Sequence, residues 1–127
     1  MATGLSSYLA NAWLDSAGNA SSFSVSTVYI KLHIGDPTST GTANPATETI
    51  RNTASFGAAS AGSLTSDADV TWTNIAGSQT ATYFSAWDAA SAGNFLFSGS
   101  VTGNPYNAGD TFTIASGALT VSLTLAS

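Results

Sequence analysis

The fold class of this 127-residue chain follows from one stretch, which reads Val28-Tyr29-Ile30-Lys31-Leu32-His33-Ile34-Gly35-Asp36-Pro37. Apolar and more polar side chains alternate from Val28 to Ile34 with a period of two, which is typical of a β-strand with one apolar face. Pro37 has no N–H to donate to a ladder, and the residue before a proline avoids the α conformation, so the strand ends here. His33 falls on the polar side of this strand, where we expect an exposed or edge-packed side chain.

The same alternation recurs in shorter segments separated by Gly, Asn and Ser turns. The clearest lies near the C-terminus, where leucine and valine at 119, 121, 123 and 125 alternate with Thr and Ser. Further strands are expected at residues 53–56, 70–73, 82–88, 95–101 and 111–114, with 82–88 and 95–101 paired as a hairpin. Short strands with such turns favour an antiparallel arrangement. We therefore predict a mainly β chain: one antiparallel β-sandwich or barrel-like domain over residues 1–127, with one short N-terminal helix.

Residues 1–16 are predicted to form that helix or an arm. Leu5, Leu9 and Trp13 recur at four-residue spacing, which places them on one helical face. Thr3 can serve as the N-cap, and residues 15–19 are rich in helix-stopping types. The helix either packs against the sheet or docks on a neighbouring subunit.

Residues 35–50 form a second distinctive segment, because they show no periodicity and predict a long loop. Loops of this length within a compact domain are often functional. The loop and the helix together supply the candidate subunit contacts, which are Leu5, Leu9, Trp13, Asp36, Pro37, Asn44 and Pro45.

Charge excludes two classes of partner. The net charge is −5, and Lys31 and Arg51 are the only Lys and Arg residues. Two cations cannot neutralise the row of phosphates that a nucleic-acid binder contacts, and they cannot hold the chain on an anionic membrane surface. The sequence also has no apolar run of about 18 residues that would predict a transmembrane helix.

A search for chemistry returns no catalytic, cofactor-binding or metal-binding residues. The chain has no cysteine and one histidine, which does not suffice for a common zinc site. Most carboxylates fall at predicted turns, where they can cap backbone N–H groups, although Asp67 and Asp69 could share a face. No phosphate-binding loop or calcium loop is present. Trp72 and Trp87 are predicted core residues, and the alternative is a row of exposed aromatics that stack on sugars. We predict a protein that is not an enzyme.

Several stretches have the pattern of a known family. They are residues 1–11, 28–37, 41–44, 55–60, 84–90, 93–97, 109–112 and 117–121, with Arg51 near a family arginine. On these stretches the chain resembles small virion proteins of tailed bacteriophages, notably long-tailed phages of actinobacteria. The resemblance covers nearly the whole chain, and residues 49–51 depart from the family pattern.

The resemblance implies a non-enzymatic structural protein of the virion, assembled in the host cytoplasm and without a cofactor. Members of the family are described as capsid-associated, minor tail or tail-fibre-like proteins. Our first hypothesis is a capsid decoration protein on the outer head surface, because the sequence lacks the heptads or extended repeats of fibres. The alternatives are a tail-tip or tail-fibre component and a carbohydrate-binding β-sandwich module. The expected partners are the major capsid protein or tail proteins, and exposed strand edges favour a homo-oligomer.

Overall fold

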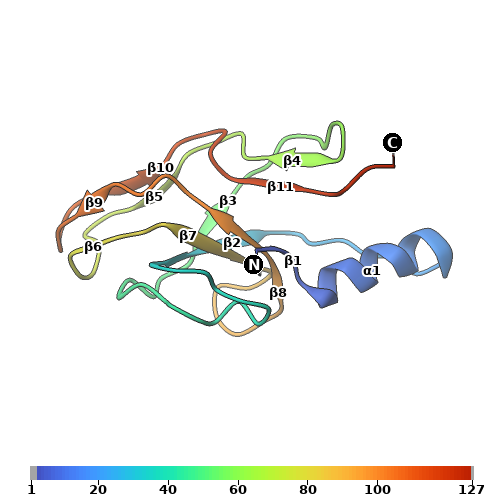
Figure 1. Cartoon of the computed structure of the whole chain (residues 1–127), viewed down its shortest axis with the longest axis horizontal. Coiled ribbons are helices and arrows are strands. Elements are labelled where there is room, and N and C mark those ends of the chain that lie inside the picture. The colour runs from blue at the N-terminus through green and yellow to red at the C-terminus, as the bar shows by residue number, and fades with distance from the viewer. Residues whose placement is uncertain (1–2, 127) are drawn as a thin grey trace.

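The computed structural model describes residues 3–126 (Figure 1). Its main sheet has five antiparallel strands. Its strands lie in the order β1-β8-β7-β2-β3. They are β1 (Gly4–Leu5), β2 (Val28–His33), β3 (Asn52–Ala54), β7 (Tyr83–Trp87) and β8 (Phe95–Ser100). The predicted hairpin is confirmed, because β7 pairs with β8 in antiparallel register.

A second layer faces this sheet and is built from two-stranded ladders (Figure 1). These ladders are β5 (Val70–Trp72) with β10 (Phe112–Ile114), and β4 (Ser63–Thr65) with β11 (Thr120–Ser122). A third ladder joins β6 (Gln79–Thr80) to β9 (Pro105–Tyr106). The core between the layers includes Ile30, Leu32, Trp72, Phe84 and Leu119, all nearly or fully buried. The predicted mainly β, sandwich-like fold is confirmed.

The helix α1 (Ser7–Gly18) begins later than predicted. Gly4 and Leu5 pair with Ser98 and Phe97 of β8, so the chain stays extended through Leu5. The N-cap is therefore Ser6, whose Oγ accepts a 3.0 Å hydrogen bond from the N–H of Leu9. Thr3 is not the cap, and the helix continues through the segment predicted to stop it, as far as Gly18. In Figure 1 α1 extends away from the end of the two layers.

The loop of residues 35–50 covers the outer face of the main sheet. It is fastened along β2 by hydrogen bonds from the N–H of Ile34 to Asn44 and from the N–H of Ala46 to Leu32. The prediction that His33 is exposed or edge-packed is wrong, because this loop buries its side chain completely. Ile34, expected on the apolar face, is 45% exposed instead.

Carboxylates cap turns, as predicted. Asp36 accepts a hydrogen bond from the N–H of Thr38, Asp88 from Asn94, and Asp110 from Asn107. Trp72 and Trp87 are buried, which confirms their assignment to the interior. The last strand is shorter than predicted: β11 ends at Ser122, and leucines 123 and 125 are about half exposed.

Candidate subunit-docking site

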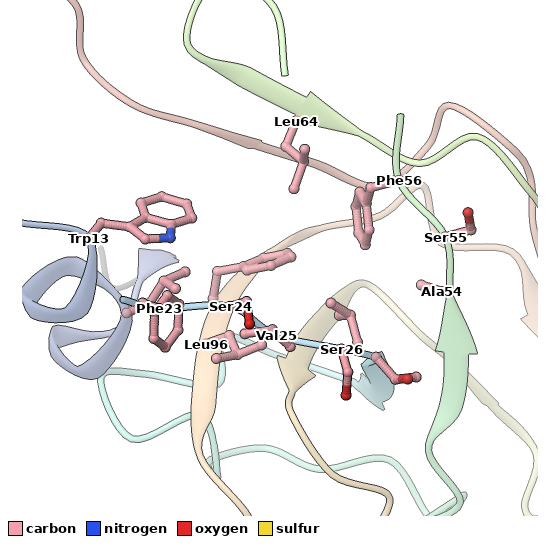
Figure 2. A pocket seen from close by; sticks show the side chains of 14 residues that line it. Trp13, Phe23, Ser24, Val25, Ser26, Ala54, Ser55, Phe56, Leu64 and Leu96 are labelled. Carbon is pink, nitrogen blue, oxygen red and sulfur yellow. The ribbon is translucent and has the colours of Figure 1, made fainter. Parts of the chain in front are cut away.

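A groove walled mainly by apolar side chains, with Ser and Thr side chains along part of its lining, lies between α1, residues 23–28 and strands β3, β4 and β8 (Figure 2). We call this hollow the α1 groove; its volume is about 440 Å³. Its main apolar walls are the side chains of Trp13, Phe23, Phe56, Leu64 and Phe97. No charged residue lines it in the described part of the chain. Such a surface can bind a partner through apolar contact and shape rather than through ion pairs.

The groove is held open by packing at its two sides. Leu9, 3% exposed, fixes α1 against the core. One helical turn later Trp13 is 36% exposed and stands at the groove beside Phe23 (Figure 2). The rings of Tyr8 and Phe23 meet edge to face with centroids 6.0 Å apart, which ties the chain after α1 back to the helix. A preformed groove requires little ordering when a partner binds.

A smaller hollow of about 130 Å³ continues past Trp13 toward β11. Leu5, Leu64, Val121 and Leu123 contribute to its almost wholly apolar lining. The first set of predicted contacts is thus brought together: Leu5 and Trp13 line the hollows, while Leu9 forms part of the floor.

The second set of predicted contacts lies in the loop on the opposite face of the main sheet. Pro37 is buried there, so its side chain packs inside this chain. Asn44 donates a 2.9 Å hydrogen bond from Nδ2 to the carbonyl of Asp36, which closes the loop on itself. Asn44 and Pro45 are exposed. The structure therefore separates the loop residues from the helix residues and does not join them in one surface.

A buried network that sequence reasoning missed anchors this loop. His33 bonds through Nδ1 to the carbonyl of Ala43 (2.8 Å) and through Nε2 to Ser85 Oγ (2.7 Å). Trp87 Nε1 donates to the same Oγ at 2.7 Å. Burial lowers the pKa of His33, and the lysine at position 31 adds to this effect. A neutral ring with its proton on Nδ1 satisfies every partner, because the Ser85 hydroxyl can then donate to Nε2.

A serine hydrogen-bonded to a histidine is also the arrangement of a nucleophile and its base. Here both His33 and Ser85 are 0% exposed, so no substrate reaches the pair. The arrangement joins the loop to the sheet.

Arg51 fastens a second loop in the same region. Its Nη1 donates to the carbonyls of Ala89 (2.9 Å) and Ala92 (2.7 Å). Its guanidinium carbon lies 4.1 Å from the ring centroid of Trp87. Burial lowers the pKa of Arg51, and the nearby Asp88 opposes that shift. The rarity of cations in the sequence and the position of Arg51 near a family arginine were the signals available for this role.

No group of three or more His, Cys, Asp or Glu side chains that could hold a metal ion occurs among residues 3–126. No helix within those residues is long and apolar enough to cross a membrane.

A family model described as Podophage GP4 fiber I protein gp80 matches residues 4–122. The chain belongs to this family. The match runs from β1 through β11 and so includes α1, both β-layers and the 35–50 loop. It confirms the resemblance to structural proteins of phage virions. No curated protein matches the chain. The family is one of fibre proteins, so it favours the tail-fibre alternative over our first hypothesis of capsid decoration.

Proposed function

We propose that this chain is a non-enzymatic structural subunit of a phage tail fibre or tail tip. The observation that carries the proposal is the fibre-family match over residues 4–122. The interior supports it, because the buried polar side chains of His33 and Ser85 hydrogen-bond each other and His33 also bonds the 35–50 loop. The sugar-binding alternative required a row of exposed aromatics on a sheet, but Trp72 and Trp87 are buried.

We propose further that the α1 groove receives apolar side chains of a neighbouring tail protein. Leu5 and Trp13 line the apolar hollows there and are accessible, unlike Leu9 and Pro37. Association through such a patch gains free energy from removing apolar surface from water and needs no charged partner.

The first experiment is quantitative mass spectrometry of purified virions, with the major capsid protein as the reference. A few copies per particle are expected for a tail-fibre or tail-tip subunit. A copy number that approaches that of the capsid protein would contradict the proposal and restore capsid decoration. Immunogold labelling of intact particles checks the position independently.

The role of the groove is tested by incorporation of variants into particles. Trp13→Ala should reduce incorporation, because it removes the exposed indole at the groove. Ile34→Ala is the matched control, since Ile34 is also partly exposed (45%) but does not line the groove. Equal incorporation of the two variants would refute the groove as the contact.

A further inference from the structure

The two cations of the chain are placed against each other. Strand β2 pairs with β3 through Ile30 and Asn52, and continuing that antiparallel register sets Lys31 opposite Arg51. Burial lowers the pKa of Lys31, and the positive charge of nearby Arg51 lowers it further. Like charges directly opposite each other on neighbouring strands destabilise a sheet. Within residues 3–126, no carboxylate pairs with Lys31, although Asp88 lies near Arg51.

Two carboxylates of the chain accept no backbone N–H group among the described residues. Five of the seven acidic side chains accept backbone N–H groups inside the chain; they are Asp36, Glu48, Asp69, Asp88 and Asp110. The side chains of the other two, Asp15 and Asp67, have no such partner among the described residues. Asp15 lies in the last turn of α1, where the helix dipole disfavours a negative charge. The negative charge of Asp15 is therefore unfavourable where it lies, as is the positive charge of Lys31 opposite Arg51.

Each of these charges has an exposed apolar neighbour. On α1, Leu14 is 69% exposed next to Asp15, and both follow Asn11 at the spacing that places the three on one side of the helix. Beside Arg51, Ile50 is 61% exposed. The backbone of Ile50 is held by Glu48 and by Trp72 Nε1, so it is fixed in position. The helix thus offers a carboxylate and an exposed leucine, and the β2–β3 side offers two cations, with Asp88 near Arg51, and an exposed isoleucine next to Arg51 in the sequence.

We propose that α1 of one copy docks on the Lys31–Arg51 pair of a second copy. Asp15 then faces the two cations, and Leu14 packs against Ile50. The helix is free to do this because it projects from the body of the molecule (Figure 1). The contact joins different surfaces of the two copies, so repetition closes a ring or extends a filament. It leaves the α1 groove open for another protein, and it holds wherever on the virion the chain is placed.

Zero-length cross-linking tests the contact directly, because Lys31 is the only lysine of the chain. A carbodiimide joins an amine to a carboxylate without a spacer, and equal mixing of unlabelled and ¹⁵N-labelled protein identifies bonds between copies. We expect mixed-isotope peptides that join Lys31 to Asp15. Absence of a cross-linked dimer at millimolar concentration, or attachment of Lys31 to Asp67 instead, would overturn the proposal.

Charge exchange gives an independent test by sedimentation equilibrium. Asp15→Lys and Lys31→Asp should each weaken self-association about tenfold or more, and the double variant should recover most of the loss. Asp67→Lys is the matched control, with the same charge change on the other unengaged carboxylate, and should leave the association unchanged. Equal effects of Asp15→Lys and Asp67→Lys would show a dependence on net charge alone and refute the contact. These measurements use purified protein, so their outcome is separate from the virion copy number.

Discussion

His33 of β2 and Ser85 of β7 are 52 residues apart in the chain, yet Nε2 and Oγ share a 2.7 Å hydrogen bond in the interior of the protein. Because Nδ1 of the same ring holds the carbonyl of Ala43, the imidazole bridges the main sheet and the 35–50 loop. Ser85 also accepts from Trp87. A protonated ring would carry a second N–H toward Oγ and displace the serine proton from its acceptor.

Stability should therefore decrease on mild acidification. The pKa of His33 is lowered by burial, so between pH 6.5, its ordinary value, and its lower folded value the unfolded chain binds a proton that the folded chain does not. This contribution to stability is complete above pH 6.5 and is lost as the pH falls through the folded value. Urea unfolding between pH 8 and pH 5 should show the midpoint decreasing over the lower part of that range. His33→Gln should flatten the decrease, and an unchanged midpoint in the parent chain would contradict the network.

Gly41 should be intolerant of a side chain. Its φ is +73°, and a Cβ built on it would lie 2.5 Å from Cδ1 of Phe95. Gly117 provides the control, since its φ is +89° but nothing lies within 4 Å of its Cβ position. Gly117→Ala should cost about 1 kcal/mol of unfolding free energy, and Gly41→Ala clearly more, from the added clash. Chemical denaturation of the two variants isolates that difference; equal losses would mean that the loop does not pack on Phe95.

The two cations should contribute to stability with different signs. Arg51→Lys keeps the charge but loses two carbonyl contacts and the stacking on Trp87, so we expect a loss of roughly 2 kcal/mol. Lys31→Thr removes a partly buried charge that faces Arg51 and should be neutral or stabilising. Thermal unfolding at low protein concentration compares them. A larger loss for Lys31→Thr than for Arg51→Lys would reverse the assigned roles.

The start of α1 can be tested by removing one hydroxyl group at a time. Ser6→Ala should destabilise the protein by about 1 kcal/mol, because the N–H of Leu9 loses its acceptor. Ser7→Ala should have almost no effect, since Ser7 is exposed in the first turn. Urea unfolding of both variants provides the measurement. Similar values would argue against Ser6 as the cap.

Much of the sheet could be predicted from hydrophobic periodicity, and the missed elements show where this signal fails. Strand β1 has two residues, too few to display a period, and it exists because Gly4 and Leu5 find partners on β8. Strand β9 begins with Pro105, a residue type that does not indicate a strand, although the first position of a short strand accepts a proline. These elements are set by long-range pairing, which a local pattern does not contain.

The groove that we propose for docking was predictable only in part. The spacing correctly placed Leu9 and Trp13 on α1, but Leu5 lies in strand β1 and reaches the smaller hollow from there. A pattern of apolar residues also cannot tell which of them the core will bury. The prediction for His33 also failed because burial depends on distant segments. The 35–50 loop buries this side chain, and the pattern of its own strand does not show that. Arg51 could be noticed for its rarity, but its contacts with residues 89 and 92 required the structure.

The borders of the main sheet have a consequence for storage and handling of the purified protein. The border strands are β1 and β3, of two and three residues, so neither side presents a long row of free backbone groups to another molecule. Short borders of this kind suppress strand-by-strand aggregation into amyloid-like material. Concentrated solutions should accordingly stay clear and free of thioflavin-binding deposits. Any association between copies should involve side chains, and added salt should weaken it.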